Sequence, residues 1–275
     1  MAEADREYVL GSSDNEIIRL GFQHEVWTEA TTDLWENAGI TYAHRVADLG
    51  CGPGFATLEL ARVVGNAGHV SAVDASDKFV KLLKERVESL RIENIDVSKG
   101  DVTSLKLEAD SYDFAFSRWL YCFLKEPERA AEEAHNILRP GGRLVILDYL
   151  NYLAAGVFPG SKKLNSVFQA YMKEVNKFYG SYNVGNELPA ILEGLGFEIV
   201  SLTPINRIAR PGEPVWQWVE MFNEISVPKL TRKRIWSAKQ RKDFEAEWEK
   251  AKEEPGTFFF SPPMIGIVAE KVEQG

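Results

Sequence analysis

The sequence predicts an α/β fold: a mostly parallel sheet of seven strands with an antiparallel last strand, plus helical cap insertions. Two observations lead to this prediction. From residue 45 onward, short apolar runs alternate with stretches of helical spacing, the pattern of βαβ units feeding a parallel sheet. Two long segments, 149–186 and 203–263, interrupt this alternation and are rich in aromatic residues. Connections of this length are usually functional insertions rather than plain loops.

Strands are expected where apolar runs lie between turn residues. Seven such runs occur, at 45–49, 69–73, 95–99, 112–117, 143–148, 196–202 and 264–271. Helical spacing predicts helices at 56–64, 76–90, 127–138 and 187–195, after one or two helices within 14–37. The run Arg139-Pro140-Gly141-Gly142 predicts a tight turn, because proline and glycine do not continue a helix. Turn residues precede the last strand, which is expected to insert antiparallel beside the sixth.

These elements divide the chain into a core, an N-terminal cover and two caps. The predicted division is a helical cover at 1–44, a core at 45–150, a cap insertion at 151–186, a continuation of the core at 187–203, a second cap insertion at 204–262 and the last core strand at 263–275. With 275 residues, the chain is long enough for one large α/β domain that carries such insertions.

Charge and composition exclude several classes of partner. The 32 Lys and Arg residues are outnumbered by 41 Asp and Glu residues, and the net charge of -9 repels the phosphate backbone of nucleic acids. No apolar run is long enough to cross a bilayer, and residues 1–14 lack the pattern of a secretory signal. We therefore expect a cytoplasmic protein without a nucleic-acid or membrane partner.

The two cysteines predict free thiols and no metal site. Cys51 lies in a glycine-rich loop and Cys122 in an apolar run, and neither belongs to a CxxC or histidine-containing cluster suited to a metal. A basic stretch with interleaved aromatics, 229–252, fits either a nucleic-acid or anionic surface or a solvated amphipathic helix. The helix is favoured, because glutamates are mixed with the basic residues and Phe244 and Trp248 are one helical turn apart.

The clearest chemical signal is the loop after the first predicted strand. Asp48 ends an apolar run and is followed by Gly50, Gly52 and Gly54 at alternate positions. Glycines at such a position allow a sharp turn and let a ligand pack against bare backbone. A plain structural turn between a strand and a helix is the alternative. The dinucleotide fingerprint GxGxxG is disfavoured, because it requires a small residue where this chain has Phe55.

From about residue 45 to residue 148 the chain resembles the class I methyltransferases that bind S-adenosylmethionine, especially their small-molecule branch. The resemblance implies a Rossmann-like fold and S-adenosylmethionine as cofactor. It implies these cofactor-binding residues: Asp48, Gly50, Gly52, Gly54, Asp74, Ala75, Asp101, Val102, Ser117, Tyr8 and Gln23.

Each of these positions has an implied role and a structural alternative. By the resemblance, Asp74 accepts from the two ribose hydroxyls, while Asp101 and the backbone amide of Val102 contact adenine. Asp74 could instead cap the helix at 76–90, and Asp101 could belong to a plain turn. The run Ser117-Arg118-Trp119 ends the fourth strand, and in the family this loop holds the methionine end of the cofactor near the transfer site.

The N-terminal cover supplies further candidates. By the resemblance, Tyr8 and Gln23 reach the carboxylate and methyl region of the cofactor, although residues of these types often serve only packing. Methyl transfer from a sulfonium is an in-line displacement, which needs placement and exclusion of water more than an acid or a base. If a general base is used, the candidates are His24, His135 and the tyrosines of the cap. His24 is preferred to His135, because His135 lies on a helix expected to pack away from the site.

The aromatic insertions predict a small, largely apolar or aromatic metabolite as the methyl acceptor. Neither the acceptor atom nor the oligomeric state follows from the sequence. Two other functions remain open: a nicotinamide-dependent oxidoreductase, and a catalytically idle module that binds the cofactor for regulation.

Overall fold

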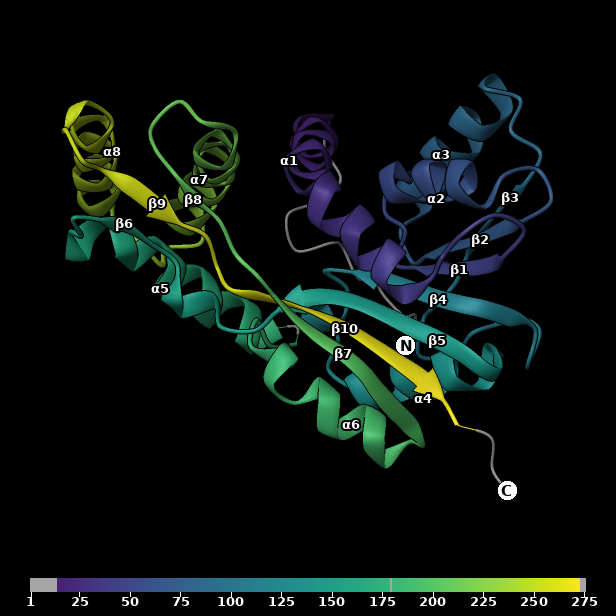
Figure 1. Cartoon of the computed structure of the whole chain (residues 1–275). Helices are drawn as coiled ribbons and strands as arrows, with labels where there is room; N and C mark the ends of the chain where they lie inside the picture. The colour runs from purple at the N-terminus through teal and green to yellow at the C-terminus, as the bar shows by residue number, and fades with distance from the viewer. Residues whose placement is uncertain (1–13, 179, 273–275) are drawn as a thin grey trace, which may run out of the picture.

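The computed structural model describes residues 14–178 and 180–272, and its centre is a seven-stranded sheet of order β3-β2-β1-β4-β5-β10-β7 (Figure 1). The strands are β1 (Arg45–Leu49), β2 (His69–Asp74), β3 (Ile95–Lys99), β4 (Tyr112–Arg118), β5 (Leu138–Tyr149), β7 (Phe197–Ile205) and β10 (Met264–Lys271). The first five strands are mutually parallel. The predicted α/β fold with a mostly parallel sheet is confirmed.

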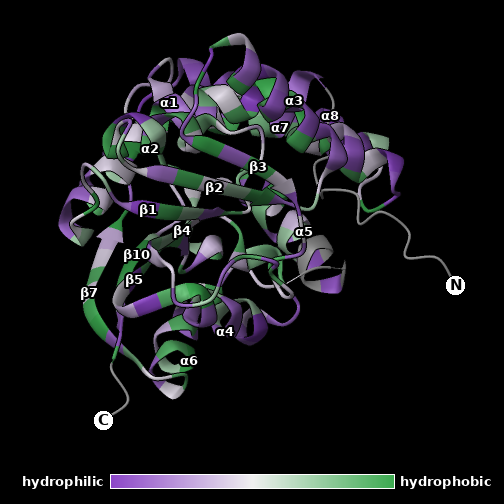
Figure 2. Ribbon diagram, turned by 90° about the vertical axis from the view of Figure 1, so that its right-hand side faces the viewer, coloured by the Kyte–Doolittle hydropathy of each residue, from purple (hydrophilic) through white to green (hydrophobic). Residues whose placement is uncertain are grey.

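Helices cover both faces of this sheet. They are α1 (Asp14–Ala38), α2 (Phe55–Val64), α3 (Asp77–Ser89), α4 (Pro127–Ile137) and α6 (Leu188–Gly194). The first three lie on one side of the sheet, and α4 and α6 lie on the other, as Figures 1 and 2 both show. Short 3-10 turns occur at η1 (Tyr121–Phe123), η2 (Tyr152–Ala154) and η3 (Val184–Asn186).

Helix α1 is part of the core and more than a surface cover. Trp27 and Trp35 on this helix are almost completely buried. The Trp35 ring meets Phe116 of β4 edge to face, with the ring centroids 5.2 Å apart. Burying two tryptophans contributes several kcal/mol of hydrophobic free energy. The helix is therefore fixed against the sheet.

The last strand lies between two neighbours. Met264 at the start of β10 is opposite Tyr149 of β5 and opposite Ile205 of β7, and both pairings are antiparallel. The predicted antiparallel insertion is confirmed. β10 also separates β7 from β5, so β7 forms an edge of the sheet.

The start of β5 differs from the prediction. The run 139–142 is not a separate tight turn, because β5 begins at Leu138 and continues through it. Leu138 is opposite Tyr112 and Arg143 is opposite Phe114, so the register shifts within this run. Gly141, with a φ of 72°, takes the left-handed conformation that such a bulge needs.

The two insertions form one cap beyond the carboxyl ends of the parallel strands, on the left in Figure 1. Its helices are α5 (Lys162–Phe178), α7 (Pro214–Arg232) and α8 (Ala238–Glu253). The predicted helices are present in the insertions, and a second sheet, β6-β9-β8, which the sequence analysis did not predict, occurs there as well. Its strands are β6 (Gly156–Phe158), β8 (Ile208–Ala209) and β9 (Phe258–Phe260). This sheet buries Phe259 completely and stacks it on Phe168 of α5, a pairing that local sequence patterns do not reveal.

The basic stretch 229–252 is mostly the amphipathic helix α8. Phe244 and Trp248 are buried, and Trp248 stacks on Trp216 of α7. Arg241 pairs with Glu245. Among the described residues, no helix is both long and apolar enough to span a bilayer.

Candidate functional site

The loop that joins β1 to α2 is held in a conformation that only glycine adopts easily. Gly50, Gly52 and Gly54 have φ values of 70°, 55° and 85°, in the left-handed region. A Cβ on Gly50 would lie 2.7 Å from Leu120, and a Cβ on Gly54 would lie 2.1 Å from Leu83. A Cβ on Gly52 would meet nothing within 4 Å. Gly50 and Gly54 are therefore required by packing as well as by φ, whereas Gly52 borders open space.

That space is a cavity of about 250 Å³ at the carboxyl ends of β1, β2 and β4. We call it the cofactor cavity. It is lined by Leu20, Gln23, Asp48, Gly50, Cys51, Gly52, Pro53, Phe55, Ala56, Asp74, Ala75, Ser76, Phe79, Gly100, Asp101, Val102, Phe116, Arg118, Trp119, Leu120, Phe123 and Leu124. Ligands of open α/β sheets bind at this edge.

Most of the predicted binding residues meet in this cavity. The structure brings together Gln23, Asp48, Gly50, Gly52, Asp74, Ala75, Asp101 and Val102. Two predicted residues are not among its lining residues: Gly54 packs behind the loop against Leu83, and Ser117 is completely buried in β4. Tyr8 lies outside the described residues.

Asp74 connects two segments of the cavity wall. One carboxylate oxygen accepts the backbone N–H of Gly52 at 2.8 Å, and the other accepts the N–H of Ser76 at 2.8 Å. Burial raises the pKa of this carboxyl above its ordinary value, against the lowering effect of these two bonds. The N-cap of α3 is Ser76, not Asp74. Because a carboxylate offers about four acceptor positions, Asp74 has capacity left for ligand hydroxyls.

Asp101 lies in a turn and also borders the cavity. Its Oδ1 accepts the backbone N–H of Thr103 at 2.9 Å and the Thr103 hydroxyl at 2.7 Å. Val102 is buried beside it. The turn and the ligand-binding interpretations are thus compatible at this position.

Asp48 is a buried carboxyl at the floor of the cavity. Its Oδ2 accepts the Thr57 hydroxyl at 2.6 Å. Burial raises the pKa of Asp48 to about 6, although the hydrogen bond and the nearby Arg118 cation favour the charged form. Burial likewise lowers the pKa of Arg118 to about 10, against the attraction of Asp48 and Glu59.

The expected effect of Asp48→Asn is a flatter dependence of stability on pH. Because the folded pKa is raised, the native state binds more protons than the unfolded state, and wild-type stability falls as the pH rises from about 4 to about 6. The variant lacks this loss, so its unfolding free energy relative to wild type should increase by up to about 3 kcal/mol across that window. Urea unfolding at several pH values measures the difference. The exposed Asp77→Asn is the control, and parallel curves for Asp48→Asn and wild type would contradict the expectation.

His24 is held in a polar cluster and is not among the cavity-lining residues. The Arg118 guanidinium donates to its Nδ1 at 3.0 Å, and its Nε2 lies 3.2 Å from Glu59. An arginine can only donate, so Nδ1 is the acceptor and Nε2 carries the proton. Burial, followed by the Arg118 charge, lowers the pKa of His24. Neither ring nitrogen is available to a methyl acceptor in this arrangement, and we do not propose His24 as a general base.

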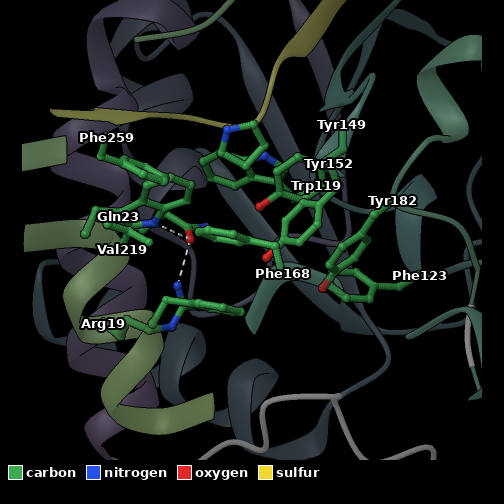
Figure 3. Close-up of a pocket in the computed structure, with 13 residues that line it drawn as sticks. Arg19, Gln23, Trp119, Phe123, Tyr149, Tyr152, Phe168, Tyr182, Val219 and Phe259 are labelled. Carbon is green, nitrogen blue, oxygen red and sulfur yellow. Dashed lines mark hydrogen bonds between the residues drawn. The ribbon is translucent and has the colours of Figure 1, made fainter. Parts of the chain in front are cut away.

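A second, smaller cavity of about 40 Å³ adjoins the first (Figure 3). We call it the aromatic cavity. It is lined by Arg19, Gln23, Trp119, Phe123, Tyr149, Tyr152, Phe168, Tyr182, Trp218, Val219, Phe222, Phe259 and Pro262. Three of these residues, Gln23, Trp119 and Phe123, also line the cofactor cavity. The two spaces therefore meet at these side chains.

The loop 118–124 contains Arg118 and Trp119, which the resemblance places near the methionine end of the cofactor, and Phe123, which the sequence analysis did not assign. Trp119 and Phe123 lie between the two cavities, and Arg118 holds His24. The backbone N–H of Cys122 donates to Asp148 at 3.2 Å, which ties this loop to the end of β5. One feature of the sequence could have indicated this loop: an apolar, aromatic run directly follows a predicted strand, and the carboxyl end of that strand lies at the site.

Comparison with known proteins agrees with this geometry. A family model described as a methyltransferase domain matches residues 47–146. An arsenite methyltransferase from Halobacterium salinarum is 26% identical over 61% of this chain and 40% of its own length. A ubiquinone/menaquinone biosynthesis C-methyltransferase, UbiE, from Cronobacter sakazakii is 25% identical over 68% of this chain and 78% of its own length.

The solved structures show the same fold. A SAM-dependent methyltransferase from Aquifex aeolicus superposes with a TM-score of 0.53 and 19% identity, covering 88% of this chain and 89% of that chain. The chain spans about half the length of several curated relatives, with 47%, 40% and 50% of three of them covered. The glycine loop, the strand-end acids and the sheet order agree with these similarities: residues 47–146 match a methyltransferase domain, and the chain has the fold of S-adenosylmethionine-dependent methyltransferases.

Proposed function

We propose that the protein transfers a methyl group from S-adenosylmethionine to a small, largely apolar or aromatic metabolite by in-line displacement. The observation that carries this proposal is the junction of the two cavities at Gln23, Trp119 and Phe123. One cavity has backbone and carboxylates suited to a nucleoside, and the other has aromatic walls. A methyl donor and its acceptor would face each other across that junction.

The residues present fit the cofactor. Gly52 leaves open space beside the loop backbone, and Asp74 retains acceptor capacity for two ribose hydroxyls. We assign adenine to Asp101 and Val102, and the methionine end to the region of Gln23. Bound S-adenosylmethionine supplies an electrophilic methyl group on a sulfonium.

The protein's own contribution is placement and exclusion of water. Gln23 is fixed by two hydrogen bonds to its Oε1, from Arg19 at 2.8 Å and from Trp218 at 2.9 Å (Figure 3). The rings of Trp119 and Tyr149 are stacked, with their centroids 6.4 Å apart. Rigid walls of this kind hold an acceptor in line and keep water away, which is what a displacement at carbon needs.

Calorimetry with S-adenosylmethionine, S-adenosylhomocysteine and NAD tests the cofactor. We expect binding of the first two and none of NAD. A panel of phenolic, quinone-like, fatty and amine compounds, with release of S-adenosylhomocysteine as the readout, then tests the acceptor. Binding of NAD alone would favour an oxidoreductase, whereas cofactor binding without turnover on any acceptor would favour an idle regulatory module.

A further inference from the structure

The aromatic cavity has three tyrosines whose rings pack on one another. The ring centroids are 5.2 Å apart for Tyr149 and Tyr152, 4.7 Å for Tyr152 and Tyr182, and 5.0 Å for Tyr149 and Tyr182. The ring of Phe168 belongs to the same group (Figure 3), and its centroid is 6.1 Å from that of Tyr152. The face of an aromatic ring carries negative electrostatic potential. A cavity walled by many such rings is therefore suited to a cation.

Arg19 is the charged residue among the described residues that line this cavity, and its partner Glu16 lies outside the lining. Arg19 binds Glu16 through two hydrogen bonds, from Nε at 2.9 Å and from Nη2 at 2.7 Å, and both residues are buried. Its Nη1 donates to Gln23 at 2.8 Å. A bidentate pair of this kind is strong and leaves little net charge. The Arg19 cation thus does not oppose a positive group in the cavity as an unpaired arginine would.

Among the described residues that line the aromatic cavity, none is suited to take a proton from an acceptor. Burial raises the pKa of Tyr149, Tyr152 and Tyr182 well above the ordinary value, so these side chains stay neutral phenols. The nearest buried carboxylate along β5, Asp148, is not in the lining. Its oxygens accept backbone N–H groups of Tyr149 and Cys122 at 2.8 and 3.2 Å.

We propose that the acceptor atom is an uncharged amine nitrogen, and that the aromatic cavity binds the ammonium group formed on it. This inference rests on the proposed methyltransferase function and names its substrate class. The nitrogen lone pair forms the new N–C bond while the C–S bond breaks, and the electron pair of the C–S bond remains on sulfur. The positive charge moves from the sulfonium to the nitrogen, and no proton has to leave during the transfer.

An oxygen or carbon acceptor makes a different demand on the site. Methylation of a hydroxyl or of a C–H group releases a proton, which needs an acceptor group close to the reacting atom. Apart from Arg19, whose charge is paired with Glu16, the described lining residues are uncharged, and their rings stabilise a positive charge through cation–π attraction. The volume of about 40 Å³ also matches a small head group, with room for roughly three water-sized units.

Binding of a matched pair of probes to wild-type protein with S-adenosylhomocysteine tests this directly. Choline carries a trimethylammonium group, and 3,3-dimethylbutan-1-ol is its uncharged isostere. We expect choline to bind at least about tenfold more tightly, the ratio that cation–π attraction in a desolvated site supports. Equal affinity, or tighter binding of the alcohol, would overturn the proposal.

Variants of Tyr152 locate the effect. Tyr152→Phe keeps the ring, so the choline preference should stay within about threefold of wild type, whereas Tyr152→Leu should lose most of it. Tyr42→Leu, at an exposed tyrosine before β1, is the matched control. Unchanged affinity for S-adenosylhomocysteine shows that each variant is folded. A choline preference that survives Tyr152→Leu in a folded protein would place the cation elsewhere and contradict the assignment.

A transfer assay separates failure of this inference from failure of the proposed function. Benzylamine and N,N-dimethylbenzylamine are compared with benzyl alcohol and phenol, and S-adenosylhomocysteine release is measured. Turnover of the amines alone supports the inference. Turnover of the alcohol or phenol alone refutes it and leaves the methyltransferase intact, while failure to bind S-adenosylmethionine or S-adenosylhomocysteine refutes both.

Discussion

Replacing Gly54 with alanine is expected to lower the free energy of unfolding by about 2–4 kcal/mol. Gly54 has a φ of 85°, and a Cβ there would lie 2.1 Å from Cδ1 of Leu83. Leu83 is fully buried, so displacing its Cδ atoms disturbs the packing around it. The strain of a left-handed alanine and the overpacking against Leu83 therefore both lower the free energy of unfolding. Urea unfolding monitored by tryptophan fluorescence measures the loss.

A double variant separates the two causes. In a Leu83→Ala background, Gly54→Ala should cost about 1–2 kcal/mol, because only the backbone strain remains. Gly52→Ala is the matched control, since Gly52 also has a positive φ but a Cβ there meets nothing within 4 Å. Equal losses for Gly54→Ala and Gly52→Ala would mean that contact with Leu83 contributes nothing.

Asp74→Ala should weaken binding of S-adenosylmethionine by about 1.5–3 kcal/mol, or about 10- to 150-fold. The substitution removes the carboxylate proposed for the ribose hydroxyls and also its bonds to the N–H groups of Gly52 and Ser76. Isothermal titration calorimetry measures the affinity. Asp77→Ala removes a nearby exposed carboxylate and should bind as wild type does.

Melting temperatures of Asp74→Ala with and without cofactor distinguish a role in holding the loop from a role in binding the ribose. If the carboxylate serves mainly to hold the loop, the variant loses thermal stability without cofactor and little affinity. If it binds the ribose, the difference in melting temperature between variant and wild type grows when S-adenosylmethionine is added. Wild-type affinity in a folded Asp74→Ala protein would remove this residue from the site.

The sequence determined the core and the glycine-rich loop that is proposed to hold the cofactor. The bounds of β1, β3 and β10, Arg45–Leu49, Ile95–Lys99 and Met264–Lys271, match the predicted strands. The buried strands β1 and β10 are mostly apolar along their length, whereas the edge strand β3 alternates Ile95 and Val97 with polar residues, and both patterns are local signals. The glycine loop could also be predicted from the sequence, because glycine is the residue that adopts a left-handed φ easily and its positions can be read directly.

Only the tertiary structure decided the acceptor side. His24 was a candidate general base in the sequence, but its ring is held by Arg118, 94 residues away. Gln23 is oriented by Trp218, which is 195 residues further along the chain. The aromatic cavity likewise joins loop 118–124, the end of β5 and the cap. Contacts across such separations depend on the order of the strands and on how the cap packs, and neither leaves a periodic pattern in the sequence. The aromatic composition of the insertions therefore predicted an apolar site, while the packing of rings from distant segments is the basis for proposing what kind of group the site binds.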